Sequence, residues 1–193
     1  MEHKGFLKSI ILIAHIIAML ACAGVSAAQT QPIFDTTDWN IEESDFFIIY
    51  YRPTADLKML LRRLNIKALP SAQTSVYSEI NPPKEICKRL DSLFNEVRSV
   101  LGMYPVVEKV KIKIFKDMGE LSEVYLILID RKENFKAFYV NKYNTIYTSE
   151  DSMTDSVMVH EMAHVVIDHY FSAIPPDIVS EMIASYVDAH FTK

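Results

Sequence analysis

Glycine and cysteine are scarce in this chain, and their scarcity excludes several kinds of site. Only four residues of 193 are glycine, too few for the glycine-rich loops that hold phosphates or dinucleotides. Of the two cysteines, Cys22 lies in an apolar N-terminal segment and Cys87 follows it alone. A single cysteine forms no internal disulfide, so we interpret Cys87 as a small buried hydrophobe on a helix. The formal net charge is −5 without a basic stripe, which argues against a nucleic-acid partner.

Length and hydrophobic content predict one globular domain behind a short leader. Half of the residues are hydrophobic, so a chain of this length can bury a core without disulfides. A basic N-terminus precedes an apolar stretch over 10–25, and small residues at 26–28 follow. This pattern is typical of an export signal. We therefore predict a signal peptide at 1–28, a single domain at 29–193, and a periplasmic or secreted protein.

Two other fates of the leader stay open. An uncleaved leader would anchor the protein, although the apolar stretch is shorter than the roughly 20 residues that a spanning helix needs. Lipidation at Cys22 would give a lipoprotein, although the preceding residues fit that signal poorly. Membrane contact is expected only in these two cases.

Hydrophobic periodicity predicts an α+β domain, with strands first and a pair of helices last. The stretch 121–129 is apolar and stays open between helix and strand. Lys109, Lys111 and Lys113 alternate with apolar residues, as in a half-exposed strand. Strands are expected at 45–51 and 107–115, with a hairpin formed by 137–140 and 145–148, and a loop at 70–83. Helices are expected at 55–64, at 84–101 ending at Gly102, at 152–170 with Ser152 and Asp155 as a capping box, and from Pro175-Pro176 almost to Phe191.

The helix predicted at 152–170 carries the residues that indicate chemistry. His160 and His164 are one turn apart, so both imidazoles project from one face and can reach a single Zn²⁺. Glu161 lies about 100° around the helix, where a carboxylate can take a proton from a metal-bound water and pass it to a leaving amine. Apolar residues on both sides of the motif predict a buried helix, where each of these polar groups would cost a few kcal/mol unpaired. A zinc ion satisfies all three.

A catalytic zinc needs a third protein ligand and an open position. Asp168 follows His164 on the same helix, where three stacked ligands would make a poor tetrahedron, so Asp168 is expected nearby or at the surface. Glu181 lies on a separate helix after a proline-marked turn and can approach the metal from the side. Its helical neighbours are apolar, so an unpaired carboxylate there would also be costly. We predict Glu181 as the third ligand.

The histidine motif and the segment after it resemble the gluzincin metallopeptidases of the peptidase MA-like type. In that group a glutamate on the next helix is the third zinc ligand, often within a proline–tryptophan–glutamate–glycine–alanine pattern. Pro176, Glu181 and Ala184 match this pattern. Ile178 and Met182 stand where tryptophan and glycine are usual.

This resemblance implies a zincin-like α+β fold with a mixed or antiparallel N-terminal sheet, the two-histidine helix and a C-terminal helix bearing the glutamate. It implies an edge strand, at 137–139 or 145–148, that binds an extended peptide by strand addition; a purely structural hairpin is the alternative. The chain ends twelve residues after Glu181. We therefore expect no second helical domain, and a cleft that is shallow or completed by a protein partner.

Further roles fall to residues near these ligands. Oxyanion stabilisation has four candidates, and two other residues share the helical face of Glu181 and are candidates to orient a liganding histidine. Tyr186 also fits a place in the core. The oxyanion candidates are Tyr186, His190, Tyr170 and His169, and the orienting candidates are Ser185 and Asp188.

Three functions are compatible with such a site. The leading one is a zinc metallopeptidase that hydrolyses peptide bonds with Glu161 as general base. The second is a zinc hydrolase of another amide or ester, since function belongs to the site and not to the fold. The third is a catalytically silent zinc-binding module that docks a partner. The expected cofactor is Zn²⁺, and the expected partner is a peptide or protein substrate.

Overall fold

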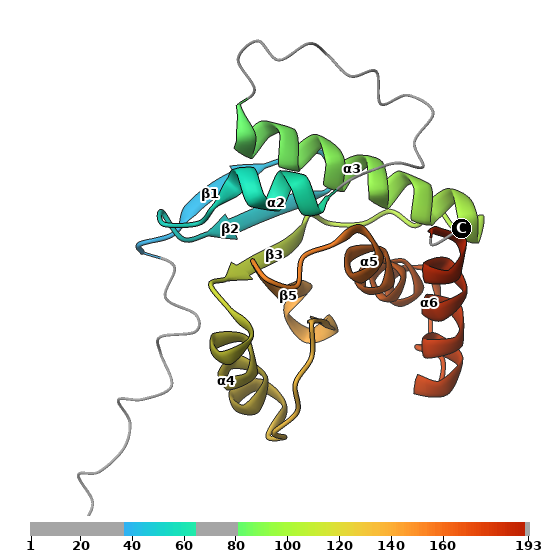
Figure 1. Ribbon diagram of the computed structural model, residues 1–193. Helices are drawn as coiled ribbons and strands as arrows, with labels where there is room; N and C mark the ends of the chain where they lie inside the picture. The colour runs from blue at the N-terminus through green and yellow to red at the C-terminus, as the bar shows by residue number, and fades with distance from the viewer. Residues whose placement is uncertain (1–36, 65–80, 192–193) are drawn as a thin grey trace, which may run out of the picture. The chain divides into compact units, whose positions relative to one another are not determined.

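The computed structural model describes residues 37–64 and 81–191, which belong to one compact unit, Thr36–Lys193. In this part of the chain a five-stranded mixed sheet combines with five α-helices, so the predicted α+β class is confirmed (Figure 1). The predicted signal peptide and most of the loop predicted at 70–83 lie outside the described residues. Among the helices of the described ranges, none is long and apolar enough to cross a membrane.

The sheet has the strand order β1-β2-β3-β5-β4. β1 (Asn40–Glu43) pairs antiparallel with β2 (Phe47–Tyr51), and β2 pairs parallel with β3 (Val110–Phe115). β5 (Thr145–Ser149) pairs parallel with β3 and antiparallel with β4 (Ala137–Val140), which confirms the predicted hairpin. β4 is therefore an edge strand of this sheet.

Capping residues explain where the helices begin and end. Asn81 accepts a hydrogen bond from the backbone of Lys84, and Gly102 ends the same helix with a left-handed φ of 63°. Asp117 caps the apolar stretch that the sequence left open, which folds as a helix. The five helices are α2 (Leu57–Arg63), α3 (Pro82–Leu101), α4 (Met118–Ile129), α5 (Asp155–Tyr170) and α6 (Asp177–Phe191).

Two local predictions are wrong. The N-cap of α5 is Thr154, whose hydroxyl accepts from the backbone of Val157, while Ser152 accepts a hydrogen bond from Ser149. The capping box predicted at Ser152 is therefore absent. Lys109 and Lys111 are exposed, as the predicted half-exposed strand requires, but Lys113 is only 6% exposed. β3 starts at 110, later than predicted.

The core lies between one face of the sheet and helices α2, α3 and α5 (Figure 1). Cys87 is buried in α3, as predicted, and burial raises the pKa of its thiol to about 11. α5 is buried around most of its circumference, which confirms the prediction from its apolar sequence. Its neighbours are α3, α6 and the edge strand β4. The fold thus places an interior helix between an edge strand and the last helix of the described chain.

Candidate metal centre

α5 presents both predicted histidine ligands on one face. The Nε2 atoms of His160 and His164 are 3.3 Å apart, an approach that the one-turn spacing permits. Both side chains keep partial access to solvent, at 28% and 19% exposure. The rest of the helix is anchored in the core, so the two imidazoles are held by a rigid element and open onto a solvent-accessible site.

α6 brings a carboxylate to the same point. The Glu181 carboxylate oxygens lie 3.5 Å from His160 Nε2 and 3.3 Å from His164 Nε2. Ligand-capable atoms of these three residues lie within 4.8 Å of one another. Two ligands each about 2.05 Å from a tetrahedral zinc ion are about 3.3 Å apart. The donor set and its spacing therefore fit Zn²⁺ with a fourth position open.

Small residues explain how α6 comes so close to α5. Ser180, Ala184 and Val187 form its buried face, and short side chains allow two helix axes to approach. Pro176 immediately precedes the helix, and its carbonyl accepts hydrogen bonds from the backbone of Val179 and Ser180 in the first turn. This local structure aims Glu181 at the histidines.

The prediction that burial forces Glu181 to find a partner is wrong. The Glu181 side chain is 60% exposed, and its apolar neighbours Ile178, Val179 and Met182 are exposed as well. Only one side of α6 is covered by other described elements. The case for Glu181 as a ligand therefore rests on its distances to the two histidines.

Electrostatics favour the neutral imidazole that a metal ligand needs, and they favour the protonated form of Glu161 in the absence of a metal. Burial lowers the pKa of His164, with the negative charge of Glu181 opposing this shift, so its imidazole stays neutral and can act as a ligand. Glu161 is 7% exposed, and burial raises its pKa to about 8. The backbone N–H of Tyr139 donates to the Glu161 carboxylate and lowers that pKa, while Glu181 raises it.

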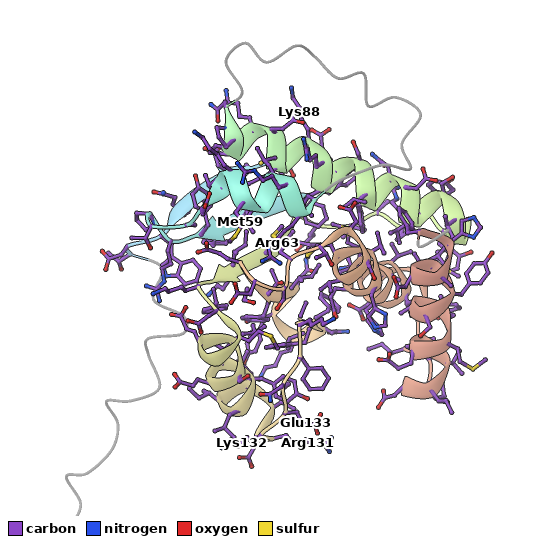
Figure 2. The ribbon with its side chains drawn as sticks, in the orientation of Figure 1. Met59, Arg63, Lys88, Arg131, Lys132 and Glu133 are labelled. Carbon is purple, nitrogen blue, oxygen red and sulfur yellow. The ribbon has the colours of Figure 1, made fainter. Side chains whose placement is uncertain are left out.

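A cleft of about 370 Å³ connects these residues, which lies within the usual range for ligand sites. The edge strand β4 and Phe135 line one side. Phe135 belongs to the exposed loop after α4, which begins with Arg131, Lys132 and Glu133 (Figure 2). The start of α6 and the loop before it line the other side. The lining residues are Phe135, Ala137, Phe138, Tyr139, Asn141, His160, Glu161, His164, Ile167, Asp168, Ile174, Asp177, Ser180 and Glu181.

A polar network that the sequence did not reveal joins β4 to α5. The Tyr139 hydroxyl donates to Asp168 Oδ2 at 2.9 Å, and the Asn141 amide donates to the other oxygen of Asp168. Asp168 therefore lies beside the cleft and holds β4 against α5. This position agrees with the prediction that Asp168 lies near the site without being a ligand. Tyr139 and Asp168 are 29 residues apart, so no local pattern predicts their contact.

The secondary candidates lie elsewhere on the two helices. Asp188 accepts a hydrogen bond from Ser156, His169 Nε2 lies 3.2 Å from Asn144 Oδ1, and Tyr170 is exposed. Tyr186 is exposed and contacts the His190 ring, so its alternative place in the core is wrong. None of the predicted oxyanion or orienting residues is among those that line the cleft: Tyr186, His190, Tyr170, His169, Ser185 and Asp188.

Comparison of the chain with protein-family models finds no match, and comparison with curated proteins finds none either. The resemblance to gluzincins therefore rests on the motif residues, and the geometry of the site carries the functional argument.

Proposed function

We propose that this protein is an exported zinc-dependent metallopeptidase of the gluzincin type, with a zincin-like fold. One observation carries the proposal: His160, His164 and Glu181 place three ligand atoms at tetrahedral spacing. Two further features support it, namely a buried carboxylate beside the histidines and an edge strand along the same cleft.

Glu161 supplies acid–base chemistry in this proposal. A zinc ion held by the three ligands acts as a Lewis acid and as an activator of water. Glu161 accepts a proton from the attacking water and returns it to the leaving nitrogen. A cation bound nearby stabilises the carboxylate and brings the raised pKa of Glu161 toward neutrality, where a general base is most effective. The Tyr139 N–H holds the carboxylate in place.

The outer side of β4 is suited to hold an extended substrate. Because the Tyr139 N–H donates to Glu161, it points away from β5 toward the free edge. Backbone groups alternate along a strand, so the N–H and carbonyl of Ala137 point the same way. A peptide that pairs with Ala137 runs along the cleft past Glu161. This position favours a peptide over a compact small molecule.

Metal analysis tests the ligand assignment. Wild-type protein should bind one zinc per chain, and His160→Ala, His164→Ala and Glu181→Ala should each lose it. Asp177→Ala is the matched control, because Asp177 lies one turn before Glu181 and lines the same cleft. Zinc retained at wild-type affinity in Glu181→Ala would show that the three-ligand site is wrong.

Hydrolysis of a quenched-fluorescent peptide library tests the reaction. Glu161→Gln should keep its zinc and lose about 10²–10⁴-fold in kcat, the usual contribution of a general base. Unchanged activity in this variant would exclude that role. Cleavage of ester or non-peptide amide substrates alone would favour the second function. A zinc-loaded protein that hydrolyses neither class would favour a partner-docking module.

A further inference from the structure

Tyr139 on the edge strand β4 is attached to α5 at two points. Its backbone N–H donates to the Glu161 carboxylate, and its hydroxyl donates to Asp168 Oδ2 at 2.9 Å. Glu161 and Asp168 are seven residues apart on the helix, so they share one face and lie about 10 Å apart along the axis. One residue of the strand therefore bridges the proposed general base and a second carboxylate two turns further along α5.

The attachment at Asp168 has two donors. The Asn141 amide donates to the other carboxylate oxygen, and Asn141 immediately follows β4. Burial and the negative charge of Asp168 raise the pKa of the Tyr139 phenol, so the hydroxyl keeps its proton and acts as a donor. Hydrogen bonds to a carboxylate are roughly twice as strong as those between neutral groups. Asp168 thus holds both the strand and the residue after it.

The attachment at Glu161 changes during the proposed reaction, whereas the attachment at Asp168 does not. A backbone N–H binds a carboxylate more strongly than a neutral carboxylic acid, so the bond from Tyr139 weakens each time Glu161 takes up a proton. In the part of the chain that the structure describes, β4 pairs with β5 alone. Without the bond to Asp168, β4 would be free to shift on α5 whenever Glu161 is protonated.

We propose that Tyr139 and Asp168 are positioning residues for hydrolysis, because their bond fixes β4 on α5. The Tyr139 N–H then keeps Glu161 oriented, and Ala137 keeps its place along the cleft. Both residues line the cleft, but the hydroxyl of one is bonded to the carboxylate of the other, so they act through Glu161 and β4 and not on the substrate. This role rests on the proposed function of Glu161 as general base.

The kinetics of Tyr139→Phe test this role, since the variant keeps the ring and the backbone N–H and loses only the hydroxyl. We expect kcat to fall about tenfold or more, because a small misplacement of a reacting group is costly. KM should change less than about threefold, because Ala137 stays paired with Thr148 of β5. Asp168→Ala should cause a similar loss, and the double variant should lose little more than either single variant. Zinc content should be unchanged in Tyr139→Phe, because β4 carries none of the proposed ligands.

Ser44→Ala is the matched control for stability. Ser44 lies between β1 and β2, at the opposite edge of the sheet from β4. Its hydroxyl donates to Asp91 at 2.7 Å and accepts from the backbone of Phe47, so this variant also loses part-buried hydrogen bonds. It should unfold more easily in urea and keep the kcat of wild-type protein. If Tyr139→Phe lowers kcat no more than Ser44→Ala does, the bond to Asp168 serves stability only and the positioning role is wrong.

Nuclear magnetic resonance of metal-free protein reports the geometry without a reaction. The backbone amide proton of residue 139 should be shifted downfield by its bond to Glu161. Asp168→Ala leaves residue 139 itself intact and should move this signal upfield, because β4 is no longer fixed, whereas Ser44→Ala should leave it in place. An unchanged signal in Asp168→Ala would overturn the proposal. Wild-type protein that hydrolyses no peptide but shows the expected shifts would overturn the proposed function and confirm that Asp168 fixes β4.

Discussion

Asp155, the first residue of α5, is predicted to destabilise the folded protein at neutral pH. Its Oδ1 atom is buried without a hydrogen-bond partner among the described residues. Burial raises the pKa of this carboxyl to about 6, and the positive charge of Arg89 opposes the shift only in part. The fold therefore favours the neutral acid. Asp155→Asn should remove the charge while keeping the shape of the side chain.

The sign and size of the effect follow from proton linkage. Between the ordinary aspartate pKa of 3.8 and its raised pKa of about 6, Asp155 binds more protons in the folded state than in the unfolded state. Its contribution to the free energy of unfolding therefore falls as pH rises through this window. Two pKa units correspond to about 3 kcal/mol, and solvent screening of this partly exposed group reduces that to about 1–2 kcal/mol. Asp155→Asn also loses the favourable interaction of the carboxylate with the helix dipole, which reduces the expected gain in stability by about 0.3–1 kcal/mol.

Urea unfolding of metal-free protein at pH 4 and pH 7 measures the difference. Asp155→Asn should be more stable than wild type by about 1 kcal/mol at pH 7 and equal or slightly less stable at pH 4. Asp151→Asn, which removes an exposed acid shortly before the helix, is the matched control and should change the free energy of unfolding at pH 7 by less than about 0.5 kcal/mol. If Asp155→Asn is less stable than wild type at pH 7, the folded state stabilises this carboxylate and the argument from burial is wrong.

Three further predictions concern the elements around the cleft. Tyr139→Phe removes the hydrogen bond to Asp168 and should cost about 1–2 kcal/mol in urea unfolding, with little further loss in an Asp168→Asn background; additive losses would contradict the network. Asn144 has a left-handed φ of 45°, so Asn144→Ala should unfold about 1 kcal/mol more easily than Asn144→Gly, and equal stability would contradict backbone strain. Removing zinc present at 100 times its dissociation constant should lower the free energy of unfolding by about 2.7 kcal/mol and the melting temperature by about 5–10 °C. Calorimetry should show no such change in Glu181→Ala.

Local sequence signals predicted most helices because capping and periodicity act over a few residues. α3 ends at Gly102 because a left-handed residue closes the helix there. β1 was missed, since Asn40–Glu43 is short and polar, and its pairing with β2 is a tertiary event. Lys113 was misjudged for the same reason: alternation shows that a strand has two faces, but only the tertiary structure shows that α4 packs against β3 and β5.

The residues of the candidate site also differ in whether local sequence or tertiary packing determines their positions. His160 and His164 share one helix, so their separation follows from the helical repeat alone. Glu181 required a guess about how a second helix packs, and the burial argument behind that guess was wrong although the distances support its role. Tyr139 and Asp168 meet only because β4 lies beside α5. The spacing of residues on one helix could be predicted from the sequence, whereas the contact of Tyr139 with Asp168 depends on how two elements pack and could not.

The two halves of the proposed metal site differ in how firmly they are held. The histidines lie on an interior helix, whereas Glu181 lies on α6, which packs along one side only. Because α6 contributes one of the three proposed ligands, a bound metal would link α6 to α5 and stabilise their packing by linkage.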